Sequence, residues 1–505
     1  IPGGVSVLDD TDSDIQVPNN INSFLWGQYV VPTEGGVWQK SNWQNIRNIN
    51  YFMTHYQSVQ AAEADVNIYV AEMRFFRALE YFNKIQLLGD VPWLEVDLNV
   101  DSEELYGPKM KRNQVFQKII EDLDFAIQWL PEAGSEEANR LNKDIARHVK
   151  ARFCLNEGTH YKYHNELEYA SEAEKWLQMA ATESDKLITS GRYEIYNTGH
   201  PQEDYFNMYR IDDKSDLKEA VLYVDYKTDI REHNMAAAGR EAGCGFSKSF
   251  VESFLCSDGL PISLSNKYLG DETMRKETAN RDPRLKQLIL TNDFPTNVTD
   301  DLKDSTFVVN EDEFITQHCF TGYRPIKGFN PIYSQALYMK SSFDGIAYRY
   351  AETLLINAEA KAELNTITDA DLDRTINQLR DRVGMPHLTV NVGFTDPKWP
   401  DWGYSLSPIL QEIRRERCIE LAGEGFRFND LKRWKAGKVL NNVLTYVGKR
   451  KPDGNLAIVY PNYTNPDLSY QAGKSRTWED KMYLYPIPTG ELQRNPQLLP
   501  QNPGW

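Results

Sequence analysis

Helical periodicity occupies both ends of this chain and is lost in its middle. Apolar residues recur at spacings of three and four over long stretches, the pattern of an amphipathic helix with one buried face. These stretches are 70–82, 113–130, 144–163 and 169–190 before the break, and 346–364, 370–383, 408–421 and a shorter piece at 428–437 after it. Helix pairs on both sides of a break predict a helical-repeat scaffold similar to tetratricopeptide proteins.

The middle of the chain lacks this helical periodicity. Between about 195 and 340, short β-like pieces such as 221–224 are separated by Gly, Pro, Asn and Asp. We therefore expect a mostly α protein with a large irregular, loop-rich subdomain and minor β structure. Its parts are an N-terminal helical-repeat part at 1–194, an irregular insertion at 195–340, and a C-terminal helical-repeat part with a tail at 341–505, together forming one compact unit.

The net charge and the lack of a recognisable targeting segment limit the partners and the cellular locations that we expect. The chain has 505 residues and a net charge of −17, which would repel phosphate backbones and anionic lipid surfaces, so nucleic acid is not an expected partner. No apolar run approaches the length of a membrane span. No targeting segment is recognisable at Ile1, so the sequence predicts either a cytoplasmic protein or one whose export segment has been removed.

Motifs for catalysis and for cofactors are absent from the sequence. It contains no Walker loop, no G-x-G-x-x-G and no G-x-S-x-G, and no C-x-x-C pair among its five cysteines, which we interpret as free buried thiols. His160 and His164 stand one helical turn apart, but two solvated polar residues explain this spacing better than a metal site. We expect no cofactor and no metal. A glycoside hydrolase remains open, since it needs only two carboxylates that the fold brings together.

The most informative run is at 413–434. It reads I-R-R-E-R-C-I-E-L-A-G-E-G-F-R-F-N-D-L-K-R-W. Charged residues at 414, 416, 417, 420 and 424 lie at spacings that let them pair along or across helix turns, and apolar residues such as Ile413 and Trp434 supply a buried face. We interpret the run as architecture rather than as a site.

Further motifs occur along the chain in a fixed order. They are the helix at 72–82 with the L-G-D-V-P turn at 88–92, I-E-D-L-D-F-A with L-P at 120–131, D-G-L-P at 258–261, N-R-D-P-R-L at 280–285, Y-R-Y-A-E-T-L-L at 348–355, Y-P-I-P at 485–488 and Q-N-P-G at 501–504. Together with the run at 413–434 they strongly resemble the SusD/RagB family. The resemblance extends over roughly residues 43 to 505.

The resemblance implies a function without catalysis. Family members are lipid-anchored proteins that face outward from a bacterial outer membrane, capture glycans and act as a lid on a TonB-dependent barrel of the SusC type. The lipidated cysteine and the first helix of the family do not appear before Trp26, so surface anchoring is only implied for this chain. A peptide- or protein-binding helical-repeat scaffold is the main alternative, and a glycoside hydrolase a lesser one.

The resemblance also implies where a ligand binds. Family members tend to place binding aromatics in the loop before the first scaffold helices and in the mid-chain insertion. Trp38 fits the first place, with Gln39, Lys40 and Asn42 as hydrogen-bonding neighbours. Four rings fit the second place: Tyr268, Phe294, Tyr323 and Tyr333. Ordinary packing under a loop is the alternative for each ring, and no residue identifies the glycan.

Overall fold

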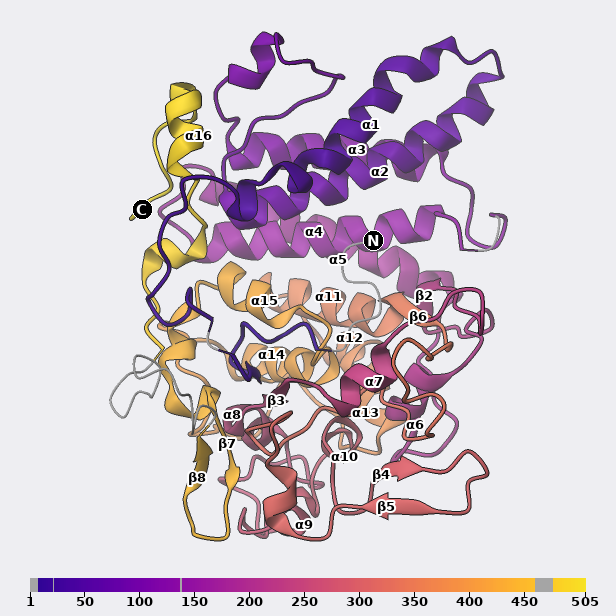
Figure 1. Ribbon diagram of the computed structural model, residues 1–505, viewed down its shortest axis with the longest axis vertical. Coiled ribbons are helices and arrows are strands. Elements are labelled where there is room, and N and C mark those ends of the chain that lie inside the picture. Colours follow the sequence, from indigo (N-terminus) through magenta and orange to yellow (C-terminus); the bar gives the residue numbers. More distant parts are fainter. Residues whose placement is uncertain (1–7, 21, 137–138, 459–475) are drawn as a thin grey trace.

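The protein is mostly helical, with short strands confined to small sheets (Figure 1). The computed structural model describes residues 8–20, 22–136, 139–458 and 476–505. The predicted mostly α fold class is confirmed. The strands form four antiparallel pairs, β1 with β3, β2 with β6, β4 with β5 and β7 with β8.

Five helices form the N-terminal scaffold. They are α1 (Gln44–His55), α2 (Glu63–Leu88), α3 (Arg112–Trp129), α4 (Lys143–Tyr163) and α5 (Ala173–Ser190). Neighbouring helices pack in the order of the chain, which is the arrangement of a helical-repeat protein. Helix α2 ends where Gly89 takes a φ of 74°, a left-handed conformation that glycine adopts without strain. Gly158 lets α4 approach α5, since a β-carbon there would lie 2.9 Å from Leu177.

The C-terminal scaffold follows the middle region. Its helices are α11 (Tyr350–Glu363), α12 (Asp369–Asp373), α13 (Ile376–Arg382), α14 (Pro408–Glu420), α15 (Arg427–Arg433) and α16 (Thr489–Arg494). The expected helix at 370–383 is two helices, because Thr375 leaves the helical conformation and donates its hydroxyl to the carbonyl of Asp371 at 2.6 Å. The helix expected from 346 begins only at Tyr350, since the preceding residues form a strand.

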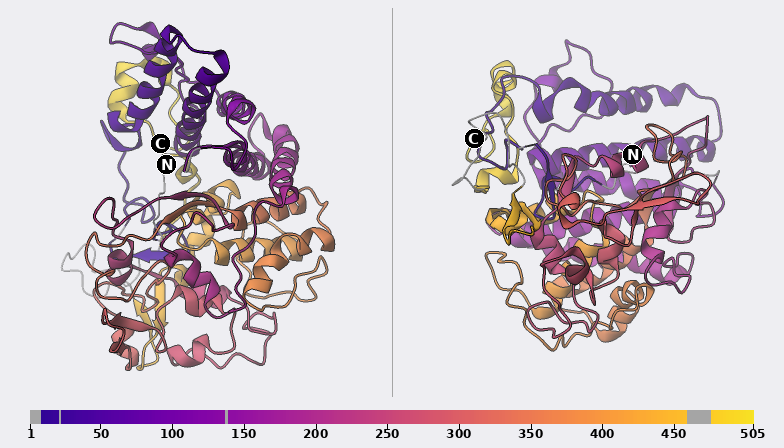
Figure 2. Two further views of the ribbon diagram at one scale, coloured as in Figure 1. Left: turned by 90° about the vertical axis from the view of Figure 1, so that its right-hand side faces the viewer. Right: turned by 60° about the horizontal axis from the view of Figure 1, so that its bottom comes forward.

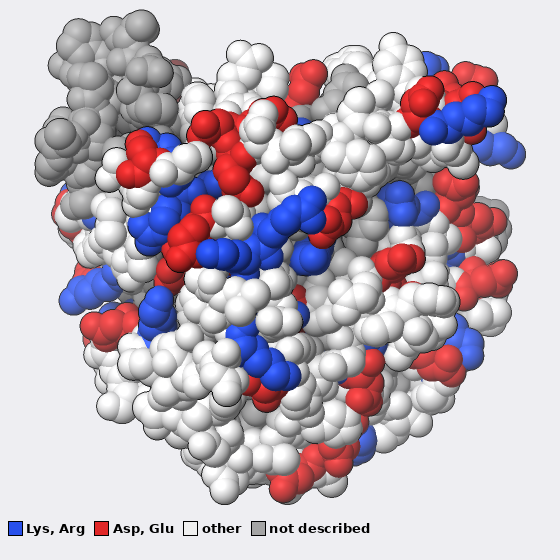
Figure 3. All heavy atoms as spheres, turned by 90° about the horizontal axis from the view of Figure 1, so that it is seen from below, with Lys and Arg blue, Asp and Glu red and all other residues white. Residues whose placement is uncertain are grey.

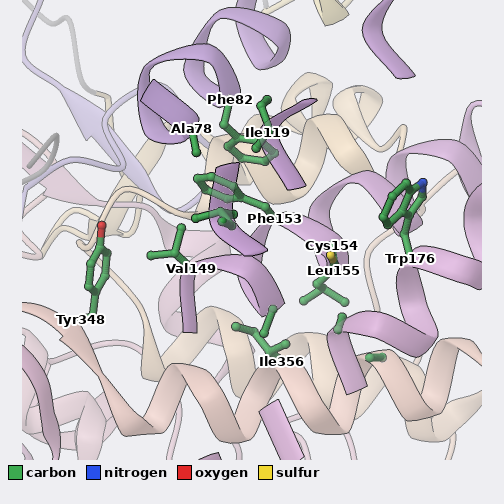
Figure 4. Packing of buried hydrophobic residues seen from close by; sticks show 14 of the residues in the cluster. Ala78, Phe82, Ile119, Val149, Phe153, Cys154, Leu155, Trp176, Tyr348 and Ile356 are labelled. Carbon is green, nitrogen blue, oxygen red and sulfur yellow. The ribbon is translucent and has the colours of Figure 1, made fainter. Parts of the chain in front are cut away.

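Helices from both ends of the chain share one hydrophobic core. Side chains of α2, α3, α4 and α5 pack with those of α11 and α14. Figure 4 shows Phe82 of α2 over Phe153 of α4, with ring centroids 3.6 Å apart, and Ile356 of α11 below them. The two helical parts are therefore held together directly, and the middle region contributes only a few residues to this core, Val221 and Leu222 of β2 and Tyr348 of β6.

The middle region forms most of a second, smaller core, to which α14 adds Cys418 and Ile419. Its short elements are β2 (Ala220–Val224), α6 (Asp204–Asn207), α7 (Met235–Arg240), β3 (Cys244–Phe246), α8 (Lys248–Ser253), α9 (Met274–Thr278), α10 (Arg284–Leu288), β4 (Pro295–Val298), β5 (Ser305–Phe307) and β6 (Gly345–Arg349). The strand expected at 221–224 is β2, and it pairs with β6, so that the start and the end of the region meet. The views in Figures 1 and 2 place α9, β4 and β5 at the opposite end of the long axis from α1.

Strands also occur outside the middle region. Strand β1 (Gln16–Pro18) pairs with β3, and β7 (Val447–Arg450) pairs with β8 (Leu456–Ile458).

All five cysteines are buried and unpaired, as expected. Within the described ranges, no helix has the length and apolar character that crossing a bilayer would require. On the face seen in Figure 3, acidic and basic side chains are interspersed, and neither sign forms a continuous field.

Candidate functional site

Three of the sequence motifs, although far apart in the chain, meet in one buried ion network. We use this name for the carboxylates of Glu416, Glu420 and Glu424 and the guanidinium groups of Arg284, Arg349 and Arg382. Arg284 belongs to the N-R-D-P-R-L motif and Arg349 to the Y-R-Y-A-E motif, 136 and 71 residues away from Glu420. These motifs are therefore parts of one structure.

Glu420 is the centre of the network. Its oxygens accept hydrogen bonds from Arg382 at 2.6 and 2.7 Å, from Arg349 at 2.7 Å and from Arg284 at 3.0 Å. Burial alone would raise the pKa of Glu420, but the surrounding guanidinium groups outweigh it and hold this pKa well below its usual range. Glu420 therefore stays ionised in the interior.

The partners of the α14 charges differ from the sequence expectation. We expected pairing along or across helix turns, but most of these charges reach other segments: Arg414 pairs with Glu363 of α11, and Arg417 with Asp430 of α15. The reason is burial, because a buried charge needs a partner at hydrogen-bonding distance and the neighbouring helices supply it. The run at 413–434 thus connects helices, and the network leaves little of its charge for a ligand.

A pocket near α1 has the character of a ligand site. This α1 pocket, with a volume of about 260 Å³, is lined by Trp38, Lys40, Trp43, Gln44, Ile46, Arg47, Asn50, Pro92, Leu94, Val96, Leu98, Glu104 and Leu105. The rings of Trp38 and Trp43 lie 5.1 Å apart at 60° and form a corner of apolar surface. Lys40 and Arg47 are exposed at its rim. Aromatic faces with a polar rim suit a ligand that has both flat apolar faces and hydroxyl groups.

Two polar atoms in this lining lack partners. Asn50 is buried and donates its amide to the carbonyl of Leu94 at 2.9 Å, which ties α1 to the following loop. Its Oδ1 and the Nε1 of Trp43 have no hydrogen-bond partner among the described residues. Other buried polar atoms in the described chain, such as the Nε1 of Trp176, also lack partners, so it is the position of these two beside Trp38 that matters.

The predicted residues around Trp38 divide into two groups. Trp38, at the end of a short 3₁₀ turn (Gly36–Trp38), and Lys40 line the α1 pocket. Gln39 and Asn42 are not among its lining residues. Gln39 donates to the Oδ1 of Asn42 at 3.5 Å, and Asn42 donates to the carbonyl of Val37 at 3.1 Å. These two amides hold the turn that presents Trp38.

Sequence reasoning missed most of the α1 pocket. Nothing in the sequence pattern singled out Trp43, which directly precedes α1, or Asn50 within that helix. The loop at 92–105 follows the G-D-V-P turn, and its apolar residues Val96 and Leu105 are exposed rather than buried. An apolar cluster in a loop next to a tryptophan is a signal that could have identified this wall.

None of the four predicted mid-chain aromatic residues lines the α1 pocket with Trp38. Tyr323 is 0% exposed, and its hydroxyl donates to both oxygens of Glu277 at 2.8 and 2.9 Å, so this ring belongs to the core and the expectation for it is corrected. Phe294 packs edge-on against Phe206 at 5.2 Å. Tyr268 is half-buried beside Arg281, and Tyr333 is 49% exposed. Phe294 and Tyr333 adjoin β4, which lies at the far end of the molecule from α1 (Figures 1 and 2).

The histidine pair is buried, which corrects the expectation of two solvated residues, and His164 has a structural partner. The rings of His160 and His164 lie 4.1 Å apart, and the Nε2 of His164 bonds the carbonyl of Lys432 at 2.9 Å. Burial lowers the pKa of His164 to about 4, so the pair is neutral near pH 7. Over the described parts of the chain, no group of three or more His, Cys, Asp or Glu side chains is placed to hold a metal ion.

The fold and its motifs have known relatives. The chain is 24% identical over 456 residues to SusD-like protein P2 of Formosa agariphila. This alignment covers 88% of this chain and 75% of that protein. A SusD-like protein from Bacteroides fragilis superposes with a TM-score of 0.74 at 23% identity, covering 99% of this chain and 93% of that one. A SusD-like carbohydrate binding protein of the same organism superposes with a TM-score of 0.70 at 21% identity, covering 98% and 93%. Residues 183–505 match the SusD family, and since this match extends over more than half of the sequence, the chain belongs to the SusD family.

Proposed function

We propose that this protein binds a glycan without cleaving it, and that the α1 pocket is the binding site. The observation that carries the proposal is the corner of Trp38 and Trp43 beside two unpartnered polar atoms. A sugar ring presents C–H groups to an aromatic face and hydroxyls to polar side chains, so it suits both features. A SusD-like relative with the same fold is described as carbohydrate binding, which supports this choice of ligand.

The carboxylates of the pocket argue against hydrolysis. Glycosidases use two carboxyl groups on either side of the scissile bond. Among the described residues that line the α1 pocket, Glu104 alone carries a carboxylate. A ligand held at this pocket is therefore captured intact.

We also propose the setting in which the glycan is captured. Membership of the SusD family supports a lipid-anchored protein on the outer membrane that delivers its ligand to a SusC-like TonB-dependent transporter. The gene should encode a lipoprotein signal and a lipidation cysteine upstream of Ile1, and the native protein should co-purify with a large barrel protein in detergent. A gene without that cysteine, or a native protein that purifies alone, would contradict this setting.

A binding survey of the wild-type protein tests the function. We expect an array of neutral oligosaccharides to give saturable binding and an array of peptides to give none. Chromatography of the bound oligosaccharide after prolonged incubation should return it at its original length. Binding to peptides alone would identify a peptide-binding scaffold, and shortened products would identify a glycoside hydrolase.

A further inference from the structure

A second cavity lies apart from the α1 pocket. It has a volume of about 580 Å³ and is enclosed by α8, α14, the loop at 396–403 and the segment at 438–444. Its size falls within the range of small-molecule sites. Among the described residues, none lines both this cavity and the α1 pocket. A ligand here would therefore be bound independently of Trp38.

Two indole rings give this cavity an apolar wall. Trp399 donates its Nε1 hydrogen to Glu412 at 2.8 Å, and Trp402 donates its own to Gln411 at 2.6 Å. Both polar edges are thus bonded to α14. What the rings contribute to the cavity is apolar surface, the kind of surface against which a sugar ring packs.

The loop that carries these rings is held in place. Asp396 is buried and accepts hydrogen bonds from Arg415 at 2.6 Å, from the hydroxyl of Ser263 at 3.0 Å and from the backbone of Lys398 at 2.9 Å. Its carboxylate therefore joins the loop to α14 and to the middle region. A wall that is already ordered loses little conformational entropy when a ligand binds.

In the described structure, three side-chain amides of the cavity have free donor groups, while each oxygen already accepts one hydrogen bond. The Oδ1 or Oε1 atom of each already accepts a protein hydrogen bond: Gln411 from Trp402, Asn441 from the backbone of Trp478 at 2.7 Å, and Asn442 from the backbone of Leu444 at 3.0 Å. Their NH₂ groups make no hydrogen bond within the described part of the chain. Each amide is left with its donor side available.

Positive charge adds to this excess of donors. Arg427 uses Nε and Nη2 to bind Asp14, and its Nη1 has no partner among the described residues. Lys438 is exposed, and in the described ranges it forms no ion pair. The lining carboxylates of Asp396 and Glu252 are paired with Arg415 and Lys398.

Asp401 is the exception among the carboxylates. It is exposed, and its Oδ1 accepts the backbone hydrogen of Gly403 at 2.9 Å. The cavity thus offers one exposed carboxylate as an acceptor. Its donors are an ammonium group, a guanidinium N–H and three amides. The cavity therefore favours a ligand that brings its own acceptors.

We propose that this cavity is a second saccharide site, which takes a sugar unit carrying an anionic group, either a carboxylate or a sulfate ester. The anion lies toward Lys438 and Arg427, and the sugar ring lies toward Trp399. The inference rests on the proposed glycan-binding function only for the choice of a saccharide. The geometry of donors and indoles is independent of the α1 pocket.

Calorimetry with matched acidic and neutral probes tests the site. The carboxylate arm compares tri-galacturonate with its methyl ester, and the sulfate arm compares a sulfated galactose trisaccharide with its unsulfated parent. We expect at least one acidic probe to bind the wild-type protein at least about tenfold more tightly than its neutral form, with affinity that falls as salt is added. The arm that binds identifies the anion. Equal affinity for acidic and neutral forms, or no binding of either acid, overturns the proposal.

Variants place the acidic probe in the cavity. Lys438→Ala should weaken its binding about five- to tenfold. Lys303→Ala removes the same charge from an exposed lysine that does not line the cavity, and it should leave the affinity unchanged. An unchanged affinity in Lys438→Ala, or equal losses in the two variants, would refute the site.

Trp38→Ala separates this inference from the proposed function. If the acidic probe occupies the second cavity, its affinity is the same in Trp38→Ala as in the wild type. If Trp38→Ala loses affinity for the acidic probe and Lys438→Ala does not, the second site is overturned and the α1 pocket is supported. In the converse result, Trp38→Ala binds every ligand with wild-type affinity and Lys438→Ala binds the acidic probe more weakly. This result would exclude the α1 pocket as a binding site and support the second site.

Discussion

The buried ion network and the α1 pocket use polar groups in opposite ways. In the network, Glu420 is sealed from solvent and has three arginine partners. In the α1 pocket, Asn50 and Trp43 each keep a polar atom without a partner among the described residues, beside the half-buried ring of Trp38. Paired charges stabilise a fold, whereas the α1 pocket carries exposed side chains, Lys40 and Arg47, that a ligand can reach.

This difference separates what the family motifs do from what the ligand requires. The motifs at 280–285, 348–355 and 413–434 supply the network, except for Arg382 of α13. The α1 pocket takes its walls from α1 and the loop at 92–105, where no part of those three motifs lies. These three motifs therefore stabilise the fold, whereas the pocket proposed as the ligand site takes one residue, Pro92, from the motif at 88–92.

Removing the centre of the network should have the largest effect. Glu420→Ala leaves Arg284, Arg349 and Arg382 buried without their shared carboxylate. Breaking one buried pair costs roughly 3–5 kcal/mol, and here three are broken at once, so we expect a severe loss in the free energy of unfolding.

Urea denaturation measures that loss. The control is Glu194→Ala, which breaks an exposed pair with Lys218 and should cost no more than about 1 kcal/mol. A Glu420→Ala protein as stable as this control would show that the network is dispensable.

Truncation of the adjoining tryptophan should come next. Trp434 is 0% exposed, its Nε1 donates to Glu359 at 2.8 Å, and Arg414 lies over its ring at 4.2 Å. Trp434→Ala should cost roughly 3–5 kcal/mol of stability and leave glycan affinity per folded molecule unchanged. Melting and calorimetry on the same sample measure both. Wild-type melting combined with lost binding would assign Trp434 to the site instead.

A buried carboxyl outside the network should respond to pH in the opposite sense to Glu420. Burial raises the pKa of Asp10 to about 7 from 3.8, although the backbone amides of Arg427 and Gly423 oppose the shift. Its protonated form contributes stability that is complete below the usual pKa and is lost as the pH rises through about 7. The lowered pKa of Glu420 gives stability that is lost only as the pH falls below the usual carboxyl range.

Asp10→Asn should isolate this contribution. The variant should lose less stability than the wild type between about pH 5 and pH 8, because asparagine does not titrate in this range. Urea midpoints for both proteins at the two pH values provide the measurement. An equal loss in the two proteins would exclude Asp10 as the source of the pH dependence.

The α1 pocket should show a smaller effect, on binding alone. One stacked ring contributes about 0.5–1.5 kcal/mol beyond burial, so Trp38→Ala should weaken binding of a neutral glycan several-fold or more. Because Trp38 lies in a surface turn and not in the network, the melting temperature should stay close to that of the wild type. A well-folded Trp38→Ala protein with unchanged affinity would remove this residue from the site.

The smallest effect is expected from the exposed ring at the other end of the molecule. Tyr333→Ala removes a ring that is 49% exposed, so stability should change by no more than about 0.5 kcal/mol. A glycan that occupies only the α1 pocket should bind this variant with wild-type affinity. Weaker binding would mean that the glycan reaches beyond the pocket to the middle region, as the mid-chain rings first suggested.

Much of the fold could be predicted from local patterns. The period in 70–82 and the glycine at 89 indicate α2 and its end, because helix formation depends on neighbours three and four residues apart. Thr375, by contrast, divides an otherwise helical stretch through its own hydroxyl, which periodicity does not register. The motifs likewise identify the family, since their order along the chain is itself a sequence property.

The partners of each group were decided only by the tertiary structure. The run at 413–434 shows that Glu420 is charged and lies in a helix, but not that three arginines 38 to 136 residues away surround it. Trp38 and Tyr323 both read as loop aromatics, yet one lines a pocket and the other is buried on Glu277. Which ring reaches solvent depends on the packing of distant segments, and that packing is a property of the whole chain.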